Sequence, residues 1–91
     1  MTFTYKSAFL KAFDGLDRPL QDLVVKAIKA ITDYLLKGEA SFGLRVKKLY
    51  DGVYEARVNS QLRIVWHQTK KEIVFALLGN HEDVRRFIKN L

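Results

Sequence analysis

The sequence of 91 residues contains no cysteine, one proline, one tryptophan and two histidines. The lack of cysteine excludes a disulfide scaffold, thiolate zinc sites and a cysteine nucleophile. No apolar run approaches the roughly 18 residues that a membrane-spanning helix needs, and residues 1–9 lack the apolar core of a signal peptide. We therefore expect a cytoplasmic protein that has no membrane partner.

Several sequence motifs of enzymes are also missing. There is no glycine-rich nucleotide loop, no dinucleotide fingerprint and no nucleophile elbow. The two histidines, His67 and His81, are not spaced as a zinc-binding pair on one helix. We expect neither a metal nor a small-molecule cofactor.

The residues that are present favour one small basic domain over 1–91. Apolar residues make up 48% of the chain and include 6 Phe, 4 Tyr and 1 Trp, which is enough to close one core. The net charge is +6 and is concentrated in the second half, since residues 44–91 carry ten basic and five acidic groups, against six and five in residues 1–43. An anionic partner, either nucleic acid or an acidic protein, is expected to bind the second half.

The first half has the apolar period of helices. Between positions 20 and 35, apolar residues recur at steps of three and four, at Leu20, Leu23, Val24, Ala27, Ile28, Ile31 and Leu35. Asp17 and Pro19 mark the start of this helix and Gly38 marks its end. A shorter helix capped by Ser7 is expected before it, with a turn over 15–19.

From Leu44 onward the apolar period changes to two, which is typical of strands. Residues 53–58 and 62–67 alternate, whereas 73–78 are apolar on both faces and indicate a buried interior strand. Short polar connections at 59–61 and 68–71 make this region an antiparallel meander. A last helix capped by Asn80 follows, and residues 2–5 are a candidate edge strand. The predicted fold is α+β: a small antiparallel sheet, two N-terminal helices packed on it and a short C-terminal helix.

The strands bring cations together. Lys47, Lys48, Arg57 and Arg63 lie on neighbouring predicted strands, and His81 begins the last helix. RNA cleavage by the ribose 2′-hydroxyl needs a base, donors for the phosphoryl oxygens and an acid for the leaving 5′-oxygen. Arginine suits the donor role and histidine suits the acid or base role. Glu55, on the same face as Arg57, is either a base or an ion-pair partner of Arg57.

Four segments of the second half match a known family pattern. They are Lys48-Leu49, Val-Tyr-Glu-Ala-Arg-Val at 53–58, Leu-Arg-Ile-Val-Trp at 62–66 and Gly-Asn-His-Glu-Asp-Val at 79–84. The chain thereby resembles the RelE/ParE superfamily of toxins from type II toxin–antitoxin modules. The resemblance implies a RelE-like fold, a cognate antitoxin as partner and, for many members, ribosome-dependent mRNA cleavage.

The resemblance assigns roles by position. Arg63 falls on the arginine that RelE-type nucleases use at the scissile phosphate, and Arg57 falls on a position that is often basic. Glu55 stands where some members have lysine, and His81 stands where members have arginine or histidine. Arg85 replaces a tyrosine that nuclease members often carry after the residue matching Val84.

The sequence thus predicts a metal-independent endoribonuclease that cleaves mRNA on the ribosome and inhibits translation. The predicted catalytic residues are Arg63, Arg57, His81 and Glu55, and the predicted RNA-binding residues are Lys47, Lys48, Arg45 and Arg85. Two alternatives stay open: a ParE-like inhibitor of DNA gyrase without enzymatic activity, and a degenerate member that binds only its antitoxin.

Overall fold

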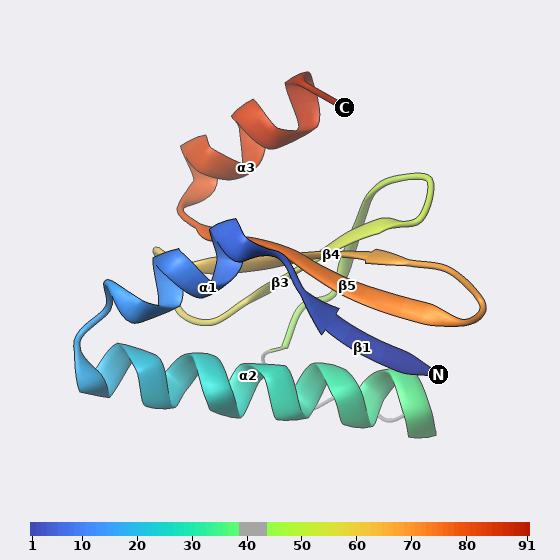
Figure 1. Ribbon diagram of the computed structural model, residues 1–91, viewed down its shortest axis with the longest axis horizontal. Helices are drawn as coiled ribbons and strands as arrows, with labels where there is room; N and C mark the ends of the chain where they lie inside the picture. The colour runs from blue at the N-terminus through green and yellow to red at the C-terminus, as the bar shows by residue number, and fades with distance from the viewer. Residues whose placement is uncertain (39–43) are drawn as a thin grey trace.

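The computed structural model describes residues 1–38 and 44–91. Its elements follow one another along the chain as β1 (Thr2–Tyr5), α1 (Ser7–Asp14), α2 (Arg18–Lys37), β2 (Lys47–Tyr50), β3 (Val53–Arg57), β4 (Arg63–Gln68), β5 (Glu72–Gly79) and α3 (His81–Lys89) (Figure 1). The predicted small α+β fold is confirmed. Within the described residues, no helix is long and apolar enough to cross a membrane.

One five-stranded sheet organises the domain, in the order β1-β5-β4-β3-β2. Strands β3 to β5 pair antiparallel, as predicted for the meander over residues 53–78, and β2 adds a further antiparallel strand at the edge. The predicted edge strand β1 exists, but it pairs with β5 in parallel, so the sheet is mixed rather than purely antiparallel. Strand β5 lies between β1 and β4, and its side chains reach both cores, Ile73, Phe75 and Leu78 in the larger one and Leu77 beside the smaller one, as expected for an interior strand.

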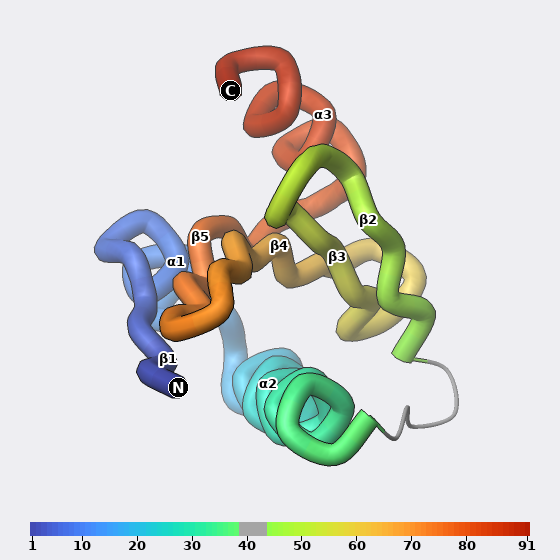
Figure 2. The backbone as a smooth tube through the Cα atoms, turned by 90° about the vertical axis from the view of Figure 1, so that its right-hand side faces the viewer, coloured from blue at the N-terminus to red at the C-terminus, as the bar shows by residue number. Residues whose placement is uncertain are grey.

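Helix α2 covers one face of the sheet, and α3 lies on the other (Figure 2). The stripe of α2 supplies Val24, Ala27 and Ile31 to the main core, where they meet Trp66, Ile64 and Phe75 from the sheet. The Asp17 side chain caps the helix by accepting a hydrogen bond from the Leu20 amide. Gly38 ends the helix with φ +74°, in the left-handed region that glycine tolerates best.

Helix α1 packs beside β5 through aromatic rings. The Phe9 ring lies 5.9 Å from that of Phe75, and Tyr5 stacks on Phe75 at 5.0 Å. The expectation that Ser7 caps α1 is wrong, because the cap position belongs to Lys6, whose side chain makes no capping hydrogen bond. Ser7 is instead the first residue of the helix.

The α3 face of the sheet has a second, smaller core. Val53 and Val65 are buried against Val84, the one fully buried residue of α3, with Leu49, Leu77 and Phe87 partly buried around them. Because a short helix crosses a sheet of five strands, it leaves space beside it on this face. That space lies next to the charged residues of β2, β3 and β4.

Candidate functional site

A groove of about 560 Å³ runs between α3 and strands β2 and β3. Three apolar residues and seven charged or polar ones line it: Lys47, Leu49, Glu55, His81, Glu82, Val84, Arg85, Arg86, Ile88 and Lys89. Four of these residues are Lys or Arg and two are Glu, so the lining carries a net charge of +2 with histidine neutral. Such a groove favours an anionic chain over a neutral one.

The pleat of the sheet determines which residues reach the groove. Lys47 pairs with Glu55 across β2 and β3, and Glu55 shares its face with Val53, whose side chain packs against α3. On β4, Arg63 shares the face of Val65 for the same reason, because residues two apart on a strand point the same way. Glu55 and Arg63 are therefore neighbours on the face that α3 partly covers.

Glu55 and Arg63 form a nearly buried ion pair. The distance from Arg63 Nε to Glu55 Oε2 is 3.5 Å, and only 11% of the Arg63 side chain and 12% of the Glu55 side chain are exposed. Among the residues that the structure describes, Nε has no hydrogen-bond partner. Because Nε is buried beside Glu55, a phosphate oxygen would be held by the four other N–H donors of the guanidinium.

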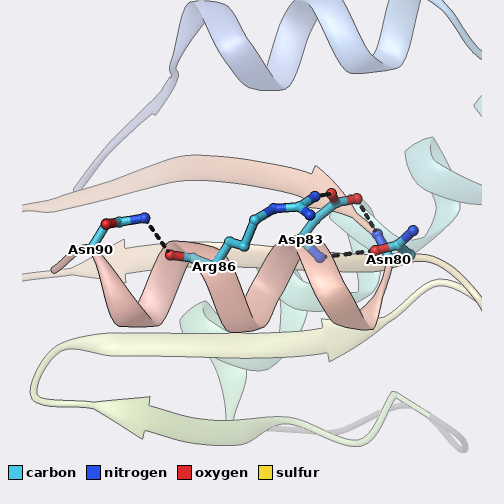
Figure 3. A network of polar contacts seen from close by, with 4 residues as sticks. All are labelled: Asn80, Asp83, Arg86 and Asn90. Carbon is cyan, nitrogen blue, oxygen red and sulfur yellow. Dashed lines mark hydrogen bonds and ion pairs between the residues drawn. The ribbon is translucent and has the colours of Figure 1, made fainter.

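His81 is the first residue of α3, directly after the cap residue Asn80. The Asn80 side chain accepts a hydrogen bond from the Asp83 amide at 2.9 Å, and the Asp83 carboxylate accepts one from the Asn80 amide at 2.8 Å (Figure 3). This reciprocal capping box contains His81 and holds its backbone. The predicted cap at Asn80 is confirmed.

Solved structures of toxins from three organisms are similar to the structure of this chain. YafQ from E. coli strain BL21(DE3) matches with a TM-score of 0.66 at 16% identity, over 90% of this chain and 94% of that one. A toxin described as YoeB/ParE, from Agrobacterium tumefaciens, matches with a TM-score of 0.68 at 13% identity, over 89% and 99% of the two chains. A chain of the RelB–RelE antitoxin–toxin complex from Methanococcus jannaschii matches with a TM-score of 0.65 at 15% identity, over 92% and 96%.

The chain has the RelE/ParE toxin fold. No protein-family model and no curated protein matches the sequence. The likeness is therefore one of structure, and the fold predicted from the four segments is the part of the resemblance that it confirms.

Within this RelE/ParE fold, the groove brings together four of the eight predicted site residues: Lys47, Glu55, His81 and Arg85. Arg63 adjoins the groove through its contact with Glu55. The ion-pair partner expected for Glu55 was Arg57, and this is wrong, because Glu55 pairs with Arg63. Arg57 lies directly opposite Arg63 across β3 and β4 and is exposed outside the lining.

Two of the predicted RNA-binding residues, Lys48 and Arg45, also lie outside the groove lining. Lys48 pairs in register with Tyr54, whose ring stacks on Trp66 in the main core, so Lys48 is on the α2 side of the sheet. Its ammonium group forms an exposed ion pair with Asp51 at 3.4 Å. Arg45 is exposed, and its φ of +50° puts a non-glycine residue in the left-handed region just before β2.

The fold adds groove residues that sequence reasoning did not assign to the site. They are Leu49, Glu82, Val84, Arg86, Ile88 and Lys89. The sequence could have indicated the α3 side of the groove, because positions 81, 85 and 89 are each four residues apart and therefore lie along one helix face. Residues 1–38 and 44–91 contain no group of three or more His, Cys, Asp or Glu side chains that could hold a metal ion.

Proposed function

We propose that this protein is the toxin of a type II toxin–antitoxin module and that it cleaves mRNA on the ribosome. The observation that carries the proposal is the nearly buried Arg63, paired with Glu55 and adjoining a basic groove that His81 also lines. The toxin fold supports the module, and the net charge of +6 supports an anionic substrate.

In the proposed reaction, the ribose 2′-oxygen attacks the adjacent phosphorus. A bond forms between phosphorus and the 2′-oxygen, and the bond to the 5′-oxygen breaks. Arg63 and Arg57 stabilise the charge on the phosphoryl oxygens. One group removes the 2′-hydroxyl proton and another protonates the leaving 5′-oxygen, and the two candidates are Glu55 and His81. The products are a 2′,3′-cyclic phosphate and a 5′-hydroxyl end.

The remaining cations orient the RNA. Lys47 and Arg85 line the groove and exposed Arg45 lies just before β2, whereas Lys48 is on the α2 side of the sheet and is left out of the proposed RNA contact. Phosphate contacts of this kind fix the register of an RNA chain without reading its sequence. We propose that the reaction needs neither a metal nor a cofactor, because the arginines supply the charge stabilisation.

The partner that restrains this activity is proposed to be an antitoxin protein in the same cytoplasm. Among the structural neighbours, YafQ is described in a complex with DinJ, and RelE in a complex with RelB. An acidic or amphipathic segment that folds on the basic face would compete with RNA for the same charges. Such a segment covers the groove or displaces α3.

Cleavage of mRNA on programmed ribosomes tests the proposal. The wild-type protein should cut the mRNA, and Arg63→Ala should lower the rate about a hundredfold, since loss of one such donor raises the barrier by about 3 kcal/mol. Arg18→Ala is the matched control, because Arg18 is an arginine of an exposed ion pair on α2. Intact mRNA with the wild-type protein, and equal growth inhibition by the wild-type and Arg63→Ala proteins, would contradict the proposal.

A second candidate function is inhibition of DNA gyrase by contact. Arg85 lines the groove where nuclease members often carry tyrosine, which removes one acid or base and adds a cation. A supercoiling assay separates the two functions, since inhibition of gyrase without mRNA cleavage selects this candidate. An antitoxin-binding member without activity would show neither effect and would not arrest growth.

A further inference from the structure

The junction between β5 and α3 has an unusually close contact at Gly79. A Cβ atom added to this glycine would lie 2.5 Å from Asp83 Oδ2 and 2.7 Å from Asp83 Cβ. The φ angle of Gly79 is not in the left-handed region, so glycine is needed here for space rather than for backbone conformation. The absence of a side chain lets Asp83 pack directly on the end of β5.

This contact ties His81 to the strand that flanks Arg63. Gly79 pairs in register with Arg63 across β4 and β5. Asp83 lies against Gly79 and also accepts the amide hydrogen bond of Asn80, the residue before His81. The capping box therefore sets the position of His81 relative to the backbone next to Arg63.

Few other contacts hold the start of α3. The helix has nine residues, and Val84 is its one fully buried residue. The second oxygen of Asp83 pairs with the Arg86 guanidinium, and the Asn90 side chain donates to the Arg86 carbonyl at 2.8 Å (Figure 3). Asp83 is thus the centre of a network that begins at the cap and runs along α3.

We infer that Asp83 is a positioning residue for His81, acting through the capping box and the space left by Gly79. The inference rests on the proposed function, in which His81 moves a proton to or from the RNA. Asp83 itself has no contact with the RNA in this proposal. A displacement of His81 by about 1 Å is enough to lower a rate by about a hundredfold.

The test measures single-turnover cleavage of mRNA on programmed ribosomes. Asp83→Ala should lower the rate at saturating protein about ten- to hundredfold, with the half-saturating concentration no more than about twofold above that of wild type, because every groove cation remains and Arg86 only loses its ion-pair partner. Asp83→Asn keeps an oxygen that can accept the Asn80 amide, so its rate should stay within a few-fold of wild type. In Gly79→Ala, the Asp83 carboxylate is present but is displaced by the new methyl group, so the cleavage rate should fall by a similar factor.

Asp17→Ala is the matched control, since Asp17 caps α2 far from the groove in the same way. It should weaken the fold as other lost caps do and leave the cleavage rate unchanged. Circular dichroism confirms that each variant is folded at the assay temperature.

A second measurement follows the His81 ring directly. The protein has two histidines, so the ring resonances of His81 are assigned by their loss in His81→Gln, and His67 is an internal reference. Asp83→Ala should shift the His81 resonances and leave those of His67 in place. If the wild-type protein does not cleave mRNA, the proposed function fails, while these resonances still decide the positioning. Unchanged His81 resonances, or a wild-type rate in folded Asp83→Ala or Gly79→Ala, would overturn the inference.

Discussion

The nearly buried pair of Glu55 and Arg63 should add little net stability, although neither partner can be removed alone without cost. Each charge has lost most of its contact with water, and the 3.5 Å separation leaves Arg63 Nε without a hydrogen bond in the described residues. Removing one partner leaves the other charge uncompensated and should cost about 3 kcal/mol. In a domain of this size, that loss lowers the melting temperature by roughly 10–25 °C.

Replacing both charges should recover most of this loss. In Glu55→Leu/Arg63→Met, apolar side chains of similar volume take over the site beside Val53 and Val65, and such replacements are often neutral or stabilising. We expect the double variant to be about as stable as wild type and to have lost mRNA cleavage. Such a result would indicate that the pair provides the proposed phosphate contact of Arg63 rather than stability.

The assay is urea or thermal unfolding of the four proteins of this double-mutant cycle. The exposed pair of Arg18 and Asp22, whose side chains are 83% and 68% exposed, provides the control cycle and should show a coupling of only about 0.5 kcal/mol. Single substitutions at Glu55 and Arg63 that each cost less than about 1 kcal/mol and add independently would show instead that the two charges are effectively solvated.

Three other predictions concern separate parts of the chain. Arg45→Gly should raise stability by about 1 kcal/mol, because φ is +50° there, and should weaken binding to RNA in a salt-dependent titration; unchanged binding would remove Arg45 from the interface. Gly52→Ala should destabilise the fold by more than about 1 kcal/mol in urea unfolding, since φ is +71° and the new Cβ would lie 3.1 Å from the Gln68 carbonyl oxygen; a stable variant would mean that the turn between β2 and β3 adapts. A transition-metal chelator such as 1,10-phenanthroline, which leaves the Mg²⁺ of ribosomes in place, should not slow cleavage, and a loss of activity restored by added metal would contradict the metal-independent mechanism.

Local patterns of the sequence were enough to predict most of the fold. The stripe of α2 and the alternation in β3 and β4 each reflect one buried face, and the signals at Asp17, Gly38 and Asn80 are short-range and chemically specific. The parallel pairing of β1 with β5 could not be predicted in this way, because a strand of four residues carries no information about the direction of its neighbour.

The candidate site was less predictable because it depends on register. That Lys47 faces the groove while Lys48 faces away is decided by the pairing of β2 with β3, which includes a shift between Lys48 and Tyr50. Glu55 pairs with Arg63, its diagonal neighbour across β3 and β4, rather than with Arg57 on its own strand, and this choice depends on the register of the two strands. The closeness of Asp83 to Gly79 is a contact across a strand-to-helix junction, which no periodicity reveals.

In the proposed mechanism, RNA bound in the groove beside Arg63 is cleaved by attack of its own ribose 2′-hydroxyl. The most direct test places a single 2′-deoxynucleotide on the 5′ side of the mapped cleavage position in mRNA on programmed ribosomes. We predict that the unmodified mRNA is cut to a 2′,3′-cyclic phosphate and a 5′-hydroxyl end, and that the 2′-deoxy substitution abolishes this cut. Cleavage of the substituted mRNA at an undiminished rate, or no cleavage of the unmodified mRNA, would contradict this mechanism.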